Sequence, residues 1–499
     1  MSMSTLDPYR RRAEEFAGAL DREYYLHFSG QKPEFDTAPI YEAYADLFTR
    51  EAVDAVEAAY RETSGDERRR AAYLAVFAID GYLGQQTREL SDQIANVEAQ
   101  TVIEVDGERI GLRQAAVAQS NEPDRERRQR IQDARLAAVD AHLNPIADEY
   151  WRRLHRLARD LGYPHYKKLY STIRGLDYDE LRAEAETFLL ATEGIYERLM
   201  ERLVPERLGV PFADLRFADL PYLWRAPEFD PAFPAERLVP TLRATLAGLG
   251  IDLDAQENVH LDTEVRELKS PRAFCAPVRV PDEIYLVVLP QGGYDDYGAL
   301  LHEAGHTEHY AHVSPERPFE YRCLGDNAVT EAFAFVFDHL LVNRNWLRDV
   351  VGFADCDAFV RFAVINDLYF LRRYAAKVAY EATFHAATGS LDHMADEYRR
   401  RLSEALFVEV PPESYLVDID PGFYAANYMR AWMLEGSLRV MLEEGYTKQW
   451  FTKPDAAAWL RELWGFGQEL GAEQLLLRYG GGRLDFGALR HLLEREVGR

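Results

Sequence analysis

The chain has 499 residues and a formal net charge of −26, from 84 acidic against 58 basic side chains. This length allows a substantial hydrophobic core and two or three lobes, and the charge argues against nucleic acid or an anionic membrane as a partner. The three cysteines are too few and too far apart for a disulfide framework, and no apolar run reaches the roughly 18 residues of a membrane span. We therefore expect a soluble, cytoplasmic protein.

The N-terminal part of the chain is predicted to be helical. Apolar and aromatic side chains recur at steps of three and four residues from Asp7 to about Gln100, as on the buried face of a helix. Residues 101–112, TVIEVDGERIGL, predict a β-hairpin instead, because two short β-branched runs are joined by Asp106 and Gly107.

A long helix is expected to start near Ser120, where the following sequence NEPD supplies a cap, an early proline and acidic first-turn residues. A basic cluster lies on this helix, with acidic residues among and around the arginines. We interpret the cluster as a solvated helix face rather than a nucleic-acid surface. Its members are Arg125, Arg127, Arg128 and Arg130.

The middle of the chain changes from helix to strand. Asp177–Leu208 predicts an amphipathic helix that stops at Gly209, and the proline-rich Pro211–Pro234 is the best linker candidate. Strands are predicted at Glu264–Leu268 and Glu283–Leu289, since the second run is short, apolar and β-branched between two prolines. We expect these strands to form a small sheet.

The stretch Leu300–Val313, LLHEAGHTEHYAHV, combines the residues of a zinc hydrolase on one predicted helix. His302 and His306 are four residues apart, so both imidazoles lie on the same helix face and can reach one metal ion. Zinc binds neutral imidazole, keeps a position open for water and lowers the pKa of that water to about 7. Glu303 follows the first histidine, where its carboxylate can take the proton from the water.

Two positions compete to be the third protein ligand. His312 lies six residues after His306, as in metzincin sites, but those sites need a glycine midway, and here the midway residue is His309. Glu331 lies 25 residues after His306 in a second predicted helix with an apolar interior, where a charge needs a partner. We favour Glu331. Asp338, on the same face, is predicted to orient a ligand histidine, or else to be an exposed carboxylate.

HEAGH followed by Glu331 at this distance resembles the gluzincins, and more narrowly the M3 family of oligopeptidases, the thimet oligopeptidase and oligoendopeptidase F group. Arg272–Pro281, RAFCAPVRVP, is similar to the family's strand before the active helix. Asp296 keeps the family's acidic residue before the first ligand, and with Asp295 it is expected to cap the helix. The resemblance covers about Ser270–Val342. It implies a mainly α, two-lobed metallopeptidase with a small β-sheet and a central channel that admits short peptides.

A later stretch, Asp420–Leu434, predicts a helix with an aspartate cap and a first-turn proline, and it places Tyr424 and Tyr428 one turn apart on one face. M3 enzymes carry a Gly-Tyr-x-Ala-x-Tyr-Tyr-x-Tyr-x-Trp segment at about this distance from the zinc motif, and its tyrosines hydrogen-bond the tetrahedral intermediate. On this resemblance Tyr428 is the main oxyanion donor and Tyr424 is its helper or a substrate contact. Simple aromatic packing is the alternative.

The stretch also departs from the family pattern. Asn427 and Arg430 replace two of the tyrosines, and Asp418 stands where the family has a histidine. Arg430 could bind a substrate carboxylate or form an ordinary ion pair. The departures leave open a catalytically weakened family member that binds peptides, and Arg430 leaves open a zinc carboxypeptidase or an amidohydrolase.

We therefore predict a helical region over residues 1–265 and a zinc catalytic region over residues 266–499. The three ligands would bind one Zn²⁺ per chain. Glu303 would activate water to hydrolyse internal bonds of short oligopeptides. The sequence predicts neither the oligomeric state nor the preferred peptide sequence.

Overall fold

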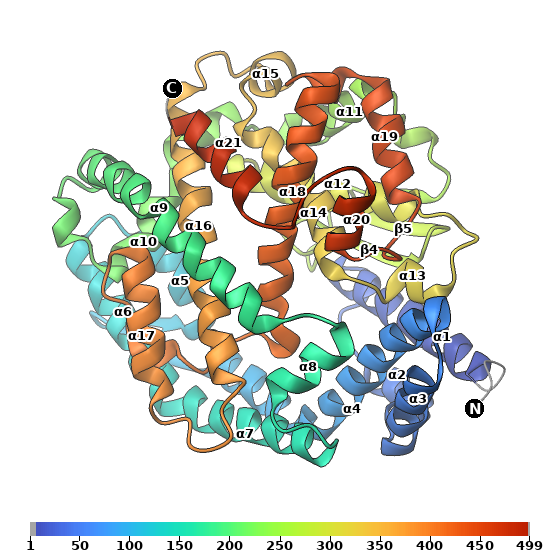
Figure 1. Cartoon of the computed structure of the whole chain (residues 1–499). Coiled ribbons are helices and arrows are strands. Elements are labelled where there is room, and N and C mark those ends of the chain that lie inside the picture. The colour runs from blue at the N-terminus through green and yellow to red at the C-terminus, as the bar shows by residue number, and fades with distance from the viewer. Residues whose placement is uncertain (1–5, 498–499) are drawn as a thin grey trace. The chain divides into compact units, whose positions relative to one another are not determined.

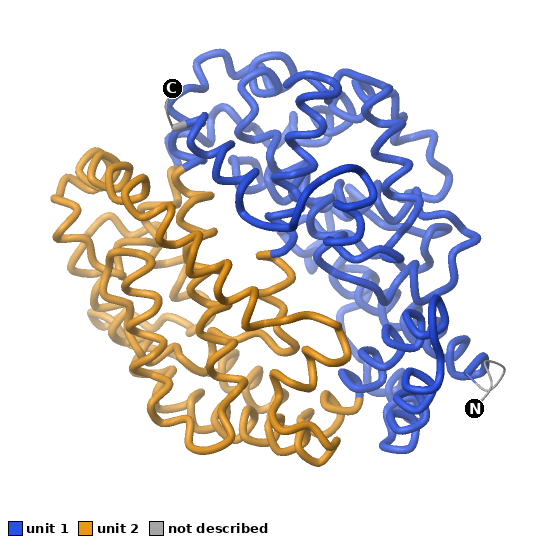
Figure 2. The backbone as a smooth tube through the Cα atoms, viewed as in Figure 1, with its two compact units in different colours: residues 1–81, 227–364, 430–499 blue, residues 82–226, 365–429 orange. Residues whose placement is uncertain are grey.

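The computed structural model describes residues 6–497 and is mainly α-helical with two small β-sheets (Figure 1). The predicted fold class is confirmed. The chain forms two compact units (Figure 2). Unit 1 comprises the chain up to Gly81, Pro227–Val364 and the chain from Arg430 onwards, and unit 2 comprises Tyr82–Ala226 and Ile365–Met429.

Both units are built from separate stretches of sequence. The predicted boundary after residue 265 lies inside the Pro227–Val364 segment of unit 1. The division into a helical and a zinc region therefore describes the sequence and not the compact units, and it stays a prediction, as does the central channel. The proline-rich segment Pro211–Pro234, predicted as a linker, contains the change from unit 2 to unit 1.

The helices divide between the units as the chain passes from one to the other. Those within unit 1 are α1 (Asp7–Phe28), α2 (Ala38–Ala43), α3 (Arg50–Glu62), α11 (Leu238–Gly248), α12 (Tyr294–Ala311), α13 (Phe319–Cys323), α14 (Asn327–Asp338), α15 (Arg344–Trp346), α19 (Pro454–Trp464), α20 (Ala472–Arg478) and α21 (Gly487–Val497). Those within unit 2 are α5 (Leu112–Ser120), α6 (Arg125–Ala138), α7 (Asn144–Asp160), α8 (Tyr166–Arg174), α9 (Tyr178–Leu208), α10 (Leu220–Arg225) and α17 (Met394–Leu406). Three helices begin in one unit and end in the other: α4 (Gly65–Gln100), α16 (Asp357–Phe384) and α18 (Tyr424–Tyr446).

The sheet of unit 1 has the strand order β3-β5-β4. The central strand β5 (Glu283–Val287) pairs in parallel with β3 (Val259–Asp262) and antiparallel with β4 (Phe274–Arg279). The predicted strand at Glu264–Leu268 is wrong, because this segment is a loop. Buried Lys269 fixes the loop by donating hydrogen bonds to the carboxylate and main-chain oxygen of Asp262, both at 2.8 Å.

The hairpin of unit 2 is confirmed. Strands β1 (Val102–Val105) and β2 (Glu108–Gly111) are antiparallel, and the two turn residues have positive φ, 55° for Asp106 and 82° for Gly107. Short two-residue hairpin turns require this conformation, which aspartate and glycine tolerate. Buried side chains of β1 then pack against α6 in a small core cluster of unit 2.

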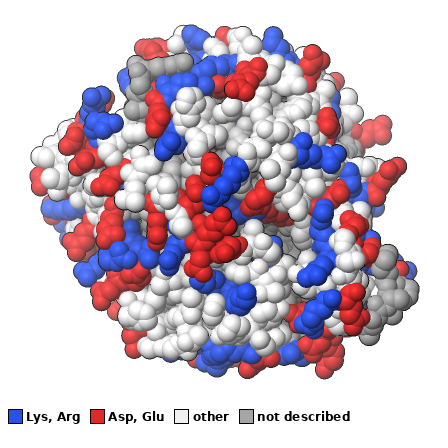
Figure 3. Space-filling model, in the orientation of Figure 1, with Lys and Arg blue, Asp and Glu red and all other residues white. Residues whose placement is uncertain are grey.

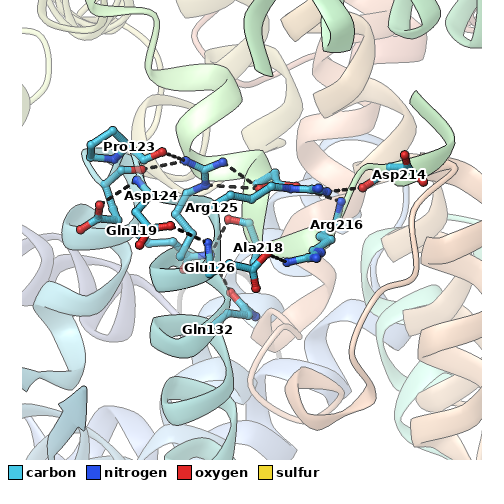
Figure 4. Close-up of polar contacts among 12 residues, drawn as sticks. Gln119, Pro123, Asp124, Arg125, Glu126, Gln132, Asp214, Arg216 and Ala218 are labelled. Carbon is cyan, nitrogen blue, oxygen red and sulfur yellow. Dashed lines mark hydrogen bonds and ion pairs between the residues drawn. The ribbon is translucent and has the colours of Figure 1, made fainter. Parts of the chain in front are cut away.

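Buried ion pairs around Asp219 hold the arginine-rich helix α6 in unit 2. Arg128 lies 2.9 Å from one oxygen of this carboxylate, and Arg125 lies 2.9 Å from the other. The neighbouring pair of Arg216 with Glu126 closes at 2.9 Å (Figure 4). The predicted solvated face is therefore wrong for Arg128, which is 3% exposed. Its charge is neutralised within the unit.

Charges of both signs are intermingled on the face drawn in Figure 3. Within residues 6–497, no helix combines the length and the apolar character that a bilayer span requires. The cytoplasmic location stays a prediction.

Candidate metal centre

Helix α12 starts after a turn of two glycines. Gly292 and Gly293 have φ of 83° and 91°, a region that side chains with a Cβ rarely adopt. The carboxylate of Asp296 accepts hydrogen bonds from the main-chain N–H groups of Gln291, at 2.8 Å, and Gly292, at 2.9 Å. The predicted role of Asp296 as a helix cap is therefore wrong, because these two N–H groups precede the helix. No side chain caps the helix at Gly293, and Asp296 instead fixes the turn that aims the helix.

Gly305 allows α12 and α14 to approach closely. A Cβ at this position would lie 2.6 Å from Cα of Ala334 and 2.7 Å from the main-chain oxygen of Phe333. Both are backbone atoms of α14, so they cannot move aside as a flexible side chain would. The glycine inside the HEAGH motif thus sets the distance at which α14 presents Glu331 to the two histidines.

Three candidate metal-binding atoms converge between the two helices. Nε2 of His302 lies 3.2 Å from Nε2 of His306, and Oε2 of Glu331 lies 3.4 Å and 3.7 Å from these two nitrogens. Each of the three residues offers one ligand atom, and these atoms all lie within 4.8 Å of one another. Among residues 6–497, this cluster of His302, His306 and Glu331 could hold a metal ion. The donor set of two imidazoles and a carboxylate suits Zn²⁺ and leaves a fourth position for water or substrate.

Each histidine is oriented by a partner on α14. Nδ1 of His302 lies 3.0 Å from Oδ2 of Asp338, and Nδ1 of His306 lies 2.9 Å from the hydroxyl oxygen of Thr330. When each Nδ1–H donates to its partner, each Nε2 keeps a lone pair for a metal. Asp338 thus lies where the sequence analysis expected it. Thr330 was not predicted, and its only signal in the sequence is that it directly precedes Glu331.

Glu303 is held beside these residues by the sheet. Its Oε2 accepts a hydrogen bond from the main-chain N–H of Cys275 in β4, at 2.8 Å. Burial raises the pKa of Glu303, while the two imidazoles and the Cys275 N–H oppose the shift. Burial, and then the charge of the Glu303 carboxylate, raise the pKa of Tyr24 in α1. A general base needs a fixed position and a pKa raised toward neutrality. The segment Arg272–Pro281, which resembles the family's strand, contains Cys275, but no sequence signal marks its main-chain N–H as a partner of Glu303.

The ligand residues share charge as well as space. Burial disfavours a charged Glu331, but hydrogen bonds and charge from His302 and His306 outweigh it and hold the pKa of this carboxyl far below its usual range. Burial similarly disfavours a protonated His302, yet Asp338 and Glu331 raise its pKa well above the usual value. The cluster of His302, His306 and Glu331 therefore favours bound positive charge, either as protons on the imidazoles or as a metal ion.

His312 lies apart from this cluster. Its Nδ1 lies 2.8 Å from the main-chain oxygen of Glu308, and its Nε2 lies 3.3 Å from the guanidinium of Arg461. His312 follows the last residue of α12, and His309 is fully buried inside the helix. The helix thus continues through the point at which a metzincin chain would turn back toward the metal.

Nearly the whole chain is similar to solved structures that are assigned as oligoendopeptidase F. No protein-family model matches the sequence, and no curated protein is detectably similar in sequence. One similar structure is a protein assigned as an oligoendopeptidase F from Bacillus anthracis strain Ames, 16% identical, with a TM-score of 0.64 over 97% of this chain and 88% of that one. Another structure assigned as an oligoendopeptidase F, at 3.1 Å resolution, is 16% identical, with a TM-score of 0.67 over 98% of this chain and 90% of that one. The chain has the oligoendopeptidase F fold. The resemblance noted from the HEAGH motif is thereby confirmed at the level of the fold.

Within this oligoendopeptidase F fold, Arg430 forms ion pairs. It is 2% exposed, and its guanidinium lies 2.7 Å from the carboxylate of Asp326 and within hydrogen-bond distance of Glu473. Asp326 is also the N-cap of α14 and accepts a hydrogen bond from the N–H of Ala328 at 3.0 Å. The ion pair that the sequence analysis left open is therefore present, and it holds the start of the helix that carries Glu331.

Tyr424 and Tyr428 lie on the first turns of α18, in unit 2. Their rings meet edge to face with centroids 5.1 Å apart, and Tyr428 meets Tyr374 in the same way at 5.6 Å. Both tyrosines are partly exposed, whereas Asn427 between them is buried. The predicted placement of the two rings on one helix face is present, and their role in an oligoendopeptidase F type of reaction stays a prediction.

Replacing Gly305 with alanine tests the close approach of the two helices. The added methyl group would overlap backbone atoms of α14, so we expect a loss of about 1–3 kcal/mol in the free energy of unfolding and weaker zinc binding. Thermal unfolding and zinc titration measure the two effects. Gly298→Ala on the same helix is the matched control, because its Cβ would lie 3.1 Å from one flexible leucine side chain. Equal effects in both variants would contradict this role of Gly305.

Replacing Thr330 with valine tests the second orienting contact. Valine has nearly the same shape but cannot accept the hydrogen bond from Nδ1 of His306. We expect zinc affinity to fall by about 10–100-fold, as for other outer partners of metal ligands. Competition with a chromogenic chelator measures the affinity, and Thr330→Ser should keep it near the wild-type value. If Thr330→Val bound zinc as tightly as Thr330→Ser, the hydroxyl would have no orienting role.

Proposed function

We propose that this protein is a zinc-dependent endopeptidase that hydrolyses short oligopeptides. The convergence of His302, His306 and Glu331 beside the half-buried Glu303 is the observation that supports it most. The oligoendopeptidase F fold agrees with a peptide substrate. Acidic residues outnumber basic residues by 84 to 58, and this negative charge fits poorly with nucleic acid as a substrate.

Each residue of the site would have a separate task in this reaction. Bound zinc would supply a Lewis acid that acidifies water and polarises the peptide carbonyl. Glu303 would take the proton from the attacking water and pass it to the leaving amine. The Cys275 N–H keeps the Glu303 carboxylate in one orientation, and Asp338 and Thr330 keep the two imidazoles in the tautomer that offers Nε2.

The tyrosines of α18 would stabilise the charge that develops on the carbonyl oxygen. We assign Tyr428 as the main donor and Tyr424 as its helper, following the resemblance to the M3 segment. One such donor contributes about 2.7–4 kcal/mol to the stability of the transition state. Asn427 and Arg430, which replace family tyrosines, would then make the reaction slower without removing the zinc chemistry.

The ion pairs of Arg430 weigh against a zinc carboxypeptidase. Recognition of a substrate's terminal carboxylate needs a cation with free donors, and Asp326 and Glu473 already occupy this guanidinium. The alternative of a weakened, peptide-binding family member rests on Asp418 and Asn427, and it differs from the endopeptidase only in turnover.

Metal analysis combined with peptide cleavage tests the proposal. The purified chain should contain about one zinc ion, and it should cut quenched fluorescent peptides at internal bonds, as mass spectrometry of the products would show. Removal of zinc by a chelator should abolish cleavage, and added zinc should restore it. Zinc content with negligible turnover on a peptide library would favour the peptide-binding alternative. Release of single C-terminal residues would favour the carboxypeptidase.

A further inference from the structure

The segment that leads into α18 is held by ion pairs from α16, all within unit 2. Asp418 lies where the M3 segment has a histidine, and its two carboxylate oxygens accept hydrogen bonds from Arg373 at 2.8 Å and 2.7 Å. Tyr398 donates a further hydrogen bond to the same carboxylate at 2.7 Å. One turn along α16, Lys377 donates to Asp420 at 2.8 Å. We name Arg373, Lys377, Asp418 and Asp420 the aspartate clamp.

The residues between the clamp and the tyrosines adopt an unusual backbone conformation. Gly422 and Phe423 both have positive φ, 65° and 58°. A phenylalanine rarely adopts this left-handed conformation, so it persists only where the surroundings enforce it. The Gly422 N–H donates to the hydroxyl of Tyr166 at 3.0 Å, and the Phe423 ring is fully buried and stacks on Tyr178 with centroids 4.0 Å apart. The direction in which α18 begins is therefore set by these contacts.

The cost of the clamp argues for a role in positioning. The side chains of Lys377 and Asp418 are only 5% and 16% exposed. Glu381 accepts the N–H of Asp420 at 3.1 Å and is fully buried, and burial raises its pKa to about 8. Burying the charges of Lys377 and Asp418 costs solvation energy, and apolar residues of the same size often stabilise a fold as well. Charged pairs that are fully hydrogen-bonded instead hold one geometry in preference to others.

Asp418 is therefore not a free acid or base. Partial burial raises the pKa of the Asp418 carboxyl, but Arg373 and Lys377 outweigh this effect and hold the pKa below its usual range. It stays ionised and bound, so it cannot take over proton transfer or hydrogen bonding from the histidine of the M3 pattern.

We infer that the aspartate clamp positions Tyr424 and Tyr428 for the reaction. Asp418 and Asp420 fix the entry to α18, so the two tyrosines project from its first turns in one orientation. The clamp residues are positioning residues, because they act through the tyrosines and not on the peptide. This inference rests on the proposed function. It gives Asp418 a positioning role, whereas the loss of the family's histidine at this position would otherwise indicate weakened catalysis.

A double-mutant cycle tests whether the clamp acts through Tyr428. The variants are Asp418→Asn, Lys377→Met, Tyr428→Phe and the two combinations with Tyr428→Phe, each assayed for zinc content and for kcat and KM on one peptide. Tyr428→Phe should lower kcat by about 10²-fold or more. Each clamp variant should lower kcat by at least fivefold with full zinc content, and Lys377→Arg should restore most of it. In the Tyr428→Phe background the clamp variants should change kcat by less than twofold.

Asp219→Asn is the matched control, since it breaks a buried aspartate–arginine pair elsewhere in unit 2. It should lower the unfolding temperature without changing kcat by more than twofold. Losses from the clamp variants and Tyr428→Phe that simply multiply would overturn the inference, because the clamp would then act on stability alone. Unchanged kcat in Asp418→Asn would overturn it as well. If Tyr428→Phe itself left kcat unchanged, the clamp would lose its target while the zinc reaction stood.

A second measurement does not depend on cleavage. Amide hydrogen exchange over residues 418–430 should rise in Asp418→Asn and stay at the wild-type rate in Asp219→Asn. If the wild-type chain cleaved no peptide, the proposed function would fail, and this exchange pattern would still decide whether the clamp orders the start of α18. Unchanged exchange in Asp418→Asn would overturn that ordering.

Discussion

Replacing Glu303 with glutamine is expected to leave zinc bound and to remove nearly all cleavage. Glutamine has the same shape, so its amide group can still accept the hydrogen bond from the Cys275 N–H through its oxygen. It cannot take a proton from water at any accessible pH. Loss of a positioned general base lowers rates by about 10²–10⁴-fold. Quenched fluorescent peptides give kcat/KM, and metal analysis of the same preparation gives the zinc content.

The comparison with Glu308→Gln makes this prediction specific. Glu308 is a buried carboxyl on the same helix and is not one of the candidate metal ligands. Its Oε1 accepts a hydrogen bond from Gln256 at 3.0 Å. Burial raises its pKa to about 7, so its neutral form is well populated near neutrality and a neutral replacement should be tolerated. We expect Glu308→Gln to keep most activity. Equal turnover of wild type and Glu303→Gln would rule out Glu303 as the base.

Replacing Glu331 with alanine should cause the chain to lose its metal, whereas His312→Ala should keep it. Glu331 supplies the anionic member of the ligand set, and two imidazoles alone leave a zinc ion with half of its four positions filled from the protein. His312 contacts Glu308 and Arg461 instead, so its loss should cost only a hydrogen bond, about 0.5–1.5 kcal/mol of stability. Zinc per chain after dialysis measures the difference.

A variant of the ligand histidine His306 completes this comparison. His306→Ala should lose zinc as Glu331→Ala does, and circular dichroism should show that both variants keep their helices. Retention of zinc by Glu331→Ala together with its loss from His312→Ala would restore the metzincin type of site.

The local parts of the site could be predicted from the sequence. His302, Glu303 and His306 lie within two turns of one helix, so helix geometry alone places them together. Glu331 could be predicted as a ligand because a charged residue inside an apolar helix needs a partner. The hairpin turn at Asp106 and Gly107 was equally local, because these residue types tolerate the required conformation.

Contacts that depend on distant packing could not be predicted. The Cys275 N–H that holds Glu303 is a main-chain group, and any residue type at that position would supply it. The loop at Glu264–Leu268 looked like a strand because its composition is partly β-branched and apolar, but Val265 is 82% exposed and Leu268 58% exposed. Burial of Arg128 depends on Asp219, which lies 91 residues away in sequence. Local patterns carry no information about such partners.

The start of α14 has a consequence for how the protein is made. Its N-cap, Asp326, is held by Arg430, which follows it by 104 residues. Ala472 donates to the same carboxylate at 3.0 Å, and Gln468 donates to the next residue, Asn327, at 3.3 Å. During translation all three ligand residues leave the ribosome well before these groups exist. Zinc should therefore be acquired only after synthesis of the C-terminal segment, and a nascent chain arrested before residue 430 should not retain it.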